Sequence, residues 1–366
     1  MTAVDDEVWS FLELVALHQG LAEEPDQRAS LVAGSGFDHG LLVQLAMRHG
    51  LLAAVADFLL RHGYRRSLPV RLRGPVISFL HLSRHRAEVL SSEAVRVNAE
   101  LATAGIPVAW TKGVVLQRSL YDGTGVRTYN DLDLMVRPAD RQRTQDTLVR
   151  LGYAPESAYN PATGTLEPIA RSLARLYQLS PDHLPHHHRL TGNPGVPVIA
   201  LDVANSLTWH QSEWDVPVDR VLAAVVSQGF PGSGTLPTMP PVHTFLFLCL
   251  HLFREAWFQR TIQAKDVSLA QFADIERQWR RSDHPTRRAV AAAVHEFHLE
   301  LPIAWVCAHT DRLLGSGTCA ELGLADRASP AWLASARGPG GRELHWHGSM
   351  RERLRDTRPL RLVARS

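Results

Sequence analysis

Apolar side chains follow two different spacings along this chain, and the spacing changes near residue 105. Up to that point they recur every three or four residues, which predicts helices, the longest from about Pro75 to Ala104. Short apolar runs follow, and these predict strands over residues 106–111, 131–136 and 196–203. Helical spacing then returns, which predicts helices over residues 242–257, 261–273 and 287–297.

The middle of the chain alternates between strand and helix patterns. One helix is expected over residues 113–121, and another over about 138–151, where Pro138 suits a first turn and Gly152 suits an end. This βαβ-like alternation implies a sheet with helices packed against it. Residues 153–195 are expected to be rich in loops, because Pro, Gly and Asn recur there.

These changes in pattern divide the chain into four parts. We expect an N-terminal helical region at 1–104, a mixed core at 105–235, a C-terminal helical region at 236–335 and a basic tail at 336–366. The tail is Gly-rich and then basic, so we expect it to be solvated or loosely packed. Its arginines are Arg351, Arg353, Arg355, Arg358, Arg361 and Arg365.

Two carboxylates interrupt the second predicted strand at alternate positions. Asp131 and Asp133 alternate with Leu132, Leu134 and Val136, so both acids project from one face, roughly 7 Å apart along the backbone. Carboxylates held this close repel each other unless a cation lies between them. Mg²⁺ suits such a pair, because it binds a few carboxylates and completes its coordination with water and phosphate.

A short turn upstream carries one of the chain's few lysines. The first predicted strand runs into Lys112 and Gly113 and then into a helix, which is a plausible cradle for phosphate. Lys265 is the other lysine; every remaining basic residue apart from histidine is Arg. The turn and the two acids together indicate metal-dependent transfer to or from a nucleotide.

Composition narrows the class of protein only a little. The hydrophobic fraction of 45% is ample for a core, and the net charge of +2 gives no electrostatic argument for a nucleic-acid partner. Cys249, Cys307 and Cys319 have no CxxC spacing, which suggests neither a disulfide framework nor a cysteine zinc site. We expect a cytoplasmic protein, because the acidic N-terminus lacks a signal-peptide pattern and the apolar run at 245–252 is too short for a bilayer.

These motifs resemble the nucleotidyltransferase superfamily. More narrowly, the chain is similar to a bacterial nucleotidyltransferase family often found beside natural-product and surface-polysaccharide genes. The resemblance covers about residues 40–280, and it rests on the stretches 46–51, 105–107, 112–113, 120–121, 127–133, 151–153 and 243–257. It implies an α+β fold, in which a small mixed β-sheet nucleotidyltransferase core at 105–235 is flanked by N-terminal and C-terminal helical regions.

The superfamily pattern implies a third carboxylate on a neighbouring strand. Asp202, in the third predicted strand, is the position that matches. The narrower family usually shows an acidic residue, one apolar residue and then His-Trp. Here Asp202 is followed by Val-Ala-Asn, and Trp209-His210 comes later, so this chain departs from the pattern.

The resemblance also implies a role for each residue of the constellation. Asp131 and Asp133 would hold Mg²⁺ or Mn²⁺, and Asp202 would complete the acceptor-side metal site and act as general base. Gly113 would let phosphates approach the backbone closely. Lys112 would bind β- or γ-phosphate oxygens of the NTP co-substrate, or pair with a nearby acid. Arg127 would do the same, or brace the strand.

Two further groups keep more than one interpretation. His183, His186, His187 and His188 lie just before the Asp202 strand, where they could bind zinc or substrate phosphate, with a plain surface loop as the default. Asp266 matches an acid usual in the family and could approach the ribose or the acceptor. It could equally be a helix-surface charge paired with Lys265 or Arg260.

The leading hypothesis is a Mg²⁺-dependent nucleotidyltransferase that moves an NMP from an NTP to a small-molecule or peptide-borne acceptor. The alternative from another class is a catalytically inactive module of the same fold that binds nucleotides or a partner. A third possibility keeps the metal site but modifies a protein. No nucleic-acid or membrane partner is expected.

Overall fold

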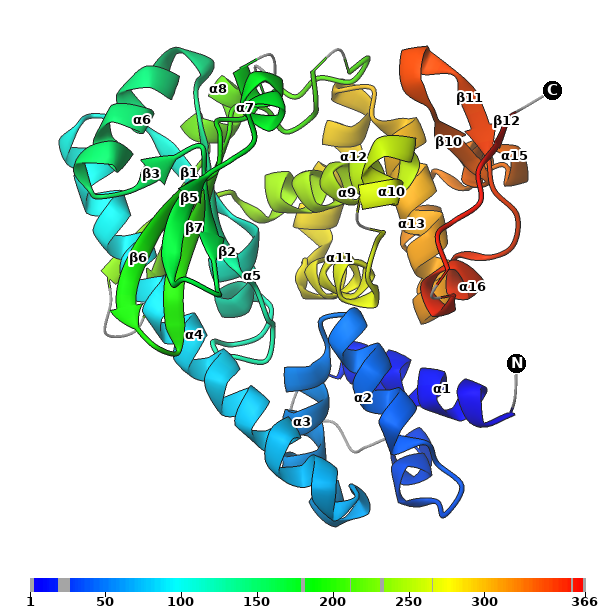
Figure 1. The fold of residues 1–366 in the computed structure, drawn as a ribbon. Coiled ribbons are helices and arrows are strands. Elements are labelled where there is room, and N and C mark those ends of the chain that lie inside the picture. Colours follow the sequence, from blue (N-terminus) through cyan, green and yellow to red (C-terminus); the bar gives the residue numbers. More distant parts are fainter. Residues whose placement is uncertain are drawn as a thin grey trace. The chain divides into compact units, whose positions relative to one another are not determined.

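The computed structural model describes residues 3–18, 27–178, 182–210, 212–230, 234–264, 266–356 and 358–364. The chain forms two compact units: residues 82–244, and residues 1–81 together with residues 245–366 (Figure 1). Helices and strands are mixed, as predicted. Within the described ranges, no helix is both long enough and apolar enough to cross a bilayer.

The unit of residues 82–244 is built on a mixed sheet, for which the described residues give seven strands in the order β3-β6-β7-β2-β1-β9-β8. The strands are β1 (Val108–Thr111), β2 (Asp131–Val136), β3 (Ala154–Pro155), β6 (His187–Asn193), β7 (Val196–Ala204), β8 (Val226–Phe230) and β9 (Gly234–Thr238). β2 lies antiparallel to β1 and parallel to β7. The β1–β2 pair is therefore not a parallel βαβ unit, but the mixed sheet with helices against it confirms the predicted α+β fold.

The helix α4 (Val70–Thr103) supplies an apolar stripe to this sheet (Figure 1). Leu90, Ala94, Val97 and Leu101 are spaced three or four residues apart, so they share one face, and all are fully buried. They join a core with alternate residues of the central strands, namely Val108, Trp110, Leu132, Leu134, Val136, Ile199, Leu201 and Val203. Side chains alternate across a strand, so the residues between these point to the opposite face of the sheet.

Glu93 ties α4 to the sheet through a buried polar network. Its carboxylate accepts hydrogen bonds from Arg96 at 2.7 Å, from the Tyr153 hydroxyl at 2.7 Å and from Arg189 of β6 at 3.1 Å. Burial alone would raise the pKa of Glu93, but the hydrogen bonds from Arg96 and Tyr153 and the charge of Arg189 lower it overall. The ionised carboxylate therefore joins the helix, strand β6 and the chain that enters β3.

The remaining elements of this unit correct one expectation. They are α5 (Lys112–Ser119), η3 (Pro138–Asp140), α6 (Arg141–Arg150), β4 (Ser157–Asn160), β5 (Thr165–Pro168), α7 (Arg171–Gln178) and α8 (Val218–Ala223). The prediction that residues 153–195 are rich in loops is wrong, because β3, β4, β5, α7 and the whole of β6 fall there. These strands are short and poor in alternating apolar residues, and β6 begins with two histidines, so the sequence pattern hid them.

The other unit is mainly helical. Its helices are α1 (Ala3–Leu17), η1 (Gln27–Ala33), α2 (His39–Arg48), α3 (Leu52–Arg61), η2 (Tyr64–Ser67), α9 (Pro241–Trp257), α10 (Gln259–Ala264), α11 (Leu269–Arg281), α12 (His284–Glu296), α13 (Glu300–Leu314), α14 (Thr318–Glu321), η4 (Ala325–Arg327), α15 (Pro330–Leu333), η5 (Pro339–Gly341) and α16 (Met350–Arg355). α4 and α9 each cross the boundary between the units. A small sheet of β10 (Ser335–Arg337), β11 (Glu343–His345) and β12 (Val363–Ala364) accompanies them.

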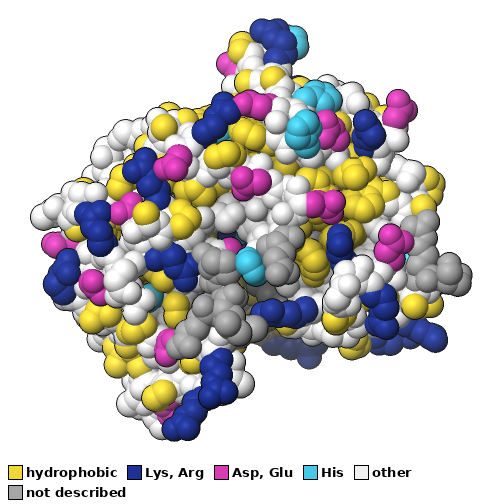
Figure 2. Space-filling model, turned by 90° about the horizontal axis from the view of Figure 1, so that it is seen from above, with side chains coloured by type: hydrophobic (Ala, Val, Ile, Leu, Met, Phe, Trp, Pro, Cys, Tyr) yellow, Lys and Arg dark blue, Asp and Glu magenta, His cyan; other side chains and the backbone are white. Residues whose placement is uncertain are grey.

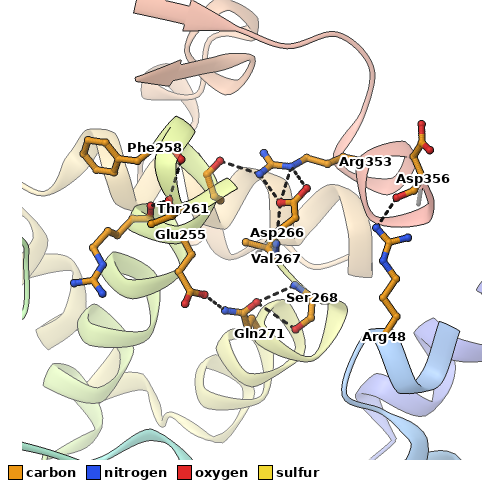
Figure 3. Close-up of polar contacts among 12 residues, drawn as sticks. Arg48, Glu255, Phe258, Thr261, Asp266, Val267, Ser268, Gln271, Arg353 and Asp356 are labelled. Atoms are coloured by element: carbon orange, nitrogen blue, oxygen red, sulfur yellow. Dashed lines mark hydrogen bonds and ion pairs between the residues drawn. The ribbon is translucent and has the colours of Figure 1, made fainter. Parts of the chain in front are cut away.

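The predicted helix at 261–273 is two helices, because the chain breaks between α10 and α11. Ser268 begins α11 with a capping box, in which its backbone N–H donates to Oε1 of Gln271 at 2.8 Å (Figure 3). Asp266 lies in the break and accepts hydrogen bonds from Arg353 (Figure 3). The predicted single helix was wrong because the local capping sequence outweighs the continuing apolar pattern.

The tail is more firmly packed than its composition suggested. Arg351 pairs with Glu13, Arg353 with Asp266 and Arg355 with Asp6, each at 2.6 Å. The Arg353 side chain is only 1% exposed, and it also donates to the carbonyl oxygen of Ala256. The expectation of a solvated or loosely packed tail is therefore wrong for Arg353 and Arg355, whereas Arg351 and Arg358 are exposed. Arg365 lies outside the described residues.

Charged side chains of both signs are interspersed over the face of the molecule in Figure 2, where Lys and Arg are blue and Asp and Glu are magenta. This distribution agrees with the net charge of +2.

Glu93→Gln should lower the free energy of unfolding by about 1–3 kcal/mol at neutral pH, because an amide cannot neutralise Arg96 and Arg189. The pKa of Glu93 is lowered in the folded state, so ionised Glu93 stabilises the fold above its unfolded-state pKa of about 4.5 and loses that effect as pH falls through the folded-state pKa. The stability difference between wild type and variant should shrink in acid.

Urea unfolding near pH 7 and below about pH 4 measures both effects. Glu88→Gln, at an exposed position on the same helix, is the matched control and should change little at either pH. Equal stability of Glu93→Gln and wild type at neutral pH would show that the network does not hold the unit together.

Candidate functional site

Three acids lie on the face of the sheet opposite α4. In the parallel pairing of β2 with β7, Asp133 is the direct partner of Asp202, and Asp131 pairs with Ala200 two positions earlier. Adjacent strands are about 4.8 Å apart, so the carboxylates of Asp133 and Asp202 start from neighbouring backbone positions on one face. Asp133 is buried, whereas Asp131 and Asp202 are partly exposed.

Lys112 brings a positive charge to these acids. It directly follows β1, where Thr111 pairs with Asp133, and its backbone lies in the left-handed region with φ of 42°. Its Nζ donates a hydrogen bond to Oδ1 of Asp133 at 2.8 Å. Burial lowers the pKa of Lys112, but the charges of Asp133 and Asp202 outweigh that effect and raise it overall. The lysine is therefore held in its charged form.

The surroundings of Asp133 disfavour its ionised form. Burial raises its pKa to about 7, even though the charge of Lys112 acts in the opposite direction. The charges of Asp131 and Asp202 contribute to this rise. The site thus holds more negative charge than the single ammonium group neutralises, which is the condition under which a cation binds favourably.

Asp202 has a different partner, His183. Nδ1 of His183 lies 3.4 Å from Oδ1 of Asp202, and the backbone of His183 forms a β-bridge with Ala204. Arg141 secures this arrangement by donating to the carbonyl oxygen of His183 and to Oδ1 of Asn205, both at 3.0 Å. Burial raises the pKa of Asp202, but the hydrogen bond and charge of His183 lower it overall. Asp202 therefore stays ionised beside the imidazole.

The histidine cluster is not the plain surface loop that was the default expectation. His187 and His188 begin β6, and His187 is fully buried, which lowers its pKa to about 4. The rings of His186 and His188 stack with centroids 6.4 Å apart. His183 is the member of the cluster that meets a predicted site acid. Across the parts of the chain that the structure describes, no three His, Cys, Asp or Glu side chains converge to hold a metal ion.

The absence of a ready metal site in the described ranges applies to the three aspartates as well as to a histidine zinc site. The carboxylates are chemically suited to Mg²⁺ or Mn²⁺, because hard divalent cations prefer oxygen ligands. In their present positions, however, Asp133 is hydrogen-bonded to Lys112 and Asp202 contacts His183. The donor set fits a divalent ion, and these side chains would have to rearrange to hold one.

Gly113 has a packing role that its predicted phosphate role did not include. A Cβ at this position would lie 2.6 Å from Cδ2 of Tyr129 and 2.9 Å from its Cγ. The ring of Tyr129 is itself buried, and its hydroxyl donates to the carbonyl oxygen of Ala87 on α4 at 3.4 Å. The absence of a side chain at Gly113 lets α5 lie directly against the loop that leads into β2.

The loop before β2 is held by α4. Arg86 donates to the carbonyl oxygens of Tyr129 and Asn130, at 3.1 Å and 3.0 Å, and its charge interacts with Asp131. The backbone N–H of Arg127 donates to Oε1 of Gln117 on α5 at 3.1 Å. These contacts fix the backbone just before the acids. These contacts do not test the phosphate contact expected of the Arg127 side chain, which stays a prediction.

Sequence reasoning missed several residues that shape this site. His183 had been grouped with its neighbours, and Arg86, Arg141 and Asn205 carried no signal in a motif. Their roles depend on contacts between residues that are 19 or more positions apart in the sequence, such as His183 with Asp202 and Arg86 with Tyr129. Asn205 alone offered a hint, since it directly follows the Asp202 strand, and its amide donates to the carbonyl oxygen of Val136.

Asp266 belongs to the other unit and has a structural partner. The guanidinium of Arg353 binds its carboxylate, with Nη2 to Oδ1 at 2.6 Å (Figure 3). The expected alternative of a pair with Arg260 therefore does not describe the observed contact, and Lys265 lies outside the described residues. Its predicted approach to ribose or acceptor remains a prediction.

Comparison with known proteins identifies a family. A family model described as "Uncharacterised nucleotidyltransferase" matches residues 35–315, well over half of the chain. That range contains Lys112, Gly113 and the three acids. A search of curated proteins finds no match.

Gly113→Ala should destabilise the protein by about 1–3 kcal/mol, because the added Cβ would overlap the ring of Tyr129. A double-mutant cycle with Tyr129→Ala, followed by urea unfolding, measures the coupling. With the ring removed, Gly113→Ala should cost much less. An equal cost with and without the ring would mean that the glycine serves another purpose.

Proposed function

The chain belongs to this family of uncharacterised nucleotidyltransferases, and we propose that it moves an NMP from an NTP to a small-molecule or peptide-borne acceptor. Pyrophosphate is the second product. The single observation that carries the proposal is the pairing of Asp133 with Asp202 on neighbouring strands, beside the Lys112-Gly113 turn at the end of β1.

In this reaction an acceptor oxygen attacks the α-phosphorus of the NTP, and the bond to the pyrophosphate oxygen breaks. Little covalent chemistry falls to the protein, so catalysis depends on positioning and on stabilising charge at the phosphoryl oxygens. When bound, Mg²⁺ or Mn²⁺ would activate the attacking oxygen and stabilise the leaving one. Asp131, Asp133 and Asp202 are the side chains that would hold it.

Asp202 is proposed to take the proton of the acceptor hydroxyl. Its lowered pKa keeps it ionised and able to bind a cation, but also makes it a weak base, so a bound metal would first have to lower the pKa of the acceptor hydroxyl. Nδ1 of His183 lies 3.4 Å from one of its oxygens. His183 would thus act as a positioning residue for Asp202.

The Lys112-Gly113 turn is proposed to receive the phosphates. α5 begins there, and the free backbone N–H groups of a helix N-terminus attract anions. An ammonium group on a flexible side chain would bind β- or γ-phosphate oxygens as a point charge. Arg127, whose backbone is anchored to α5, would add a second cation.

Asp131→Asn and Asp133→Asn should each reduce turnover by about 10²-fold or more, because each removes a charge that binds the metal. Release of pyrophosphate from NTP, with water in place of the acceptor, provides an assay that needs no known acceptor. Asp146→Asn, on the exposed face of α6, is the matched control and should retain wild-type turnover.

The same assay decides between the proposal and the inactive-module alternative. Metal-dependent NTP binding without any pyrophosphate release, across all four NTPs and both metals, would favour a binding module. Unchanged NTP affinity and turnover in both aspartate variants would exclude the three acids as the site.

A further inference from the structure

Lys112 occupies the position of a counter-ion at the three acids. Its Nζ is 2.8 Å from Oδ1 of Asp133, and Asp133 is the central acid, since β2 lies between β1 and β7 in the sheet. The lysine side chain is 18% exposed and the Asp133 side chain 8% exposed. A charged hydrogen bond at this depth is little screened by solvent.

The same oxygen is one that a divalent ion needs. Mg²⁺ and Mn²⁺ bind carboxylate oxygens at about 2.1 Å, so an ammonium group donating to that oxygen competes for it directly. Both are cations, and at this separation they also repel each other. Consistently, no three acidic, His or Cys side chains in the described ranges converge to form a ready metal site.

The backbone conformation of Lys112 also indicates that this residue is placed for its contact with Asp133. A residue that is not glycine seldom adopts a positive φ, yet Lys112 has φ of 42°. The left-handed backbone occurs at the residue whose side chain turns back to Asp133 on β2, the strand that pairs with β1. Its four-carbon chain can nevertheless leave without unfolding the turn, because it is flexible and reaches solvent.

We infer that Lys112 is a built-in counter-ion that occupies the metal site in the metal-free protein and must be displaced by the divalent ion. The nucleotide then supplies the displaced ammonium group with a new partner, a phosphate oxygen. Metal and nucleotide therefore bind cooperatively, and metal alone binds weakly. This inference rests on the proposed function, because it assumes that Asp133 is a metal ligand.

The first test is titration of Mn²⁺ by electron paramagnetic resonance, without nucleotide. Lys112→Met removes the competing charge and should bind Mn²⁺ at least about tenfold more tightly than wild type does. Lys112→Arg keeps the charge and should bind as weakly as wild type. Mn²⁺ should also raise the melting temperature of Lys112→Met more than that of wild type.

The second test uses the wild-type protein, so it does not depend on a variant that folds. The chain has only two lysines, so acetylation of Lys112 by an amine-reactive ester can be assigned by peptide mass spectrometry. Lys112 should react slowly in metal-free protein and several-fold faster once Mn²⁺ displaces it. The α-amino group serves as the internal reference.

Failure of this inference differs from failure of the proposed function. If wild type binds Mn²⁺, Asp133→Asn abolishes binding, and Lys112→Met binds no more tightly, then Lys112 is not a competitor. Unchanged acetylation of Lys112 in the presence of bound Mn²⁺ would also show that the metal does not displace it. If neither wild type nor Lys112→Met binds Mn²⁺, then the acids are not a metal site and the proposed function falls as well.

Discussion

The arrangement of the candidate site depends on the negatively charged side chains that the pairing of β2 with β7 brings together. The parallel register fixes Asp133 beside Asp202, and the alternation within β2 adds Asp131 to the same face. The protein compensates each acid locally, through Arg86 near Asp131, Lys112 on Asp133 and His183 on Asp202. The compensation is incomplete, since burial and the neighbouring acids still raise the pKa of Asp133 to about 7.

The rest of the unit keeps that face of the sheet in place. α4 covers the opposite face with its apolar stripe, so the acids have only one direction in which to project. The same helix holds the loop before β2 through Arg86 and fixes strand β6 through Glu93. Gly113 lets α5 approach Tyr129, which brings the end of β1 and the start of β2 together. A single helix therefore supports both the loop that leads into β2 and the neighbouring strand β6.

The sequence was sufficient for features encoded locally. Alternation placed β2 at its observed bounds, and the acids on one face follow from that alternation alone. The resemblance to nucleotidyltransferases, now confirmed by the family match, supplied Asp202, whose surroundings depart from the usual pattern. Contacts across distant segments were out of reach: His183 meets Asp202 only after β6 and β7 pair, and Arg353 meets Asp266 across 87 residues. The sequence predicted that Lys112 binds either phosphate or a nearby acid, and only the structure shows that it contacts an acid, Asp133.

The most direct measurement of the central claim is a crystal structure with Mn²⁺ and a non-hydrolysable NTP analogue, in which anomalous scattering locates the metal. We expect manganese peaks coordinated by Asp131, Asp133 and Asp202, with the ammonium group of Lys112 moved from Asp133 to a phosphate oxygen. Manganese bound elsewhere, with Lys112 still hydrogen-bonded to Asp133 beside the bound nucleotide, would contradict that claim.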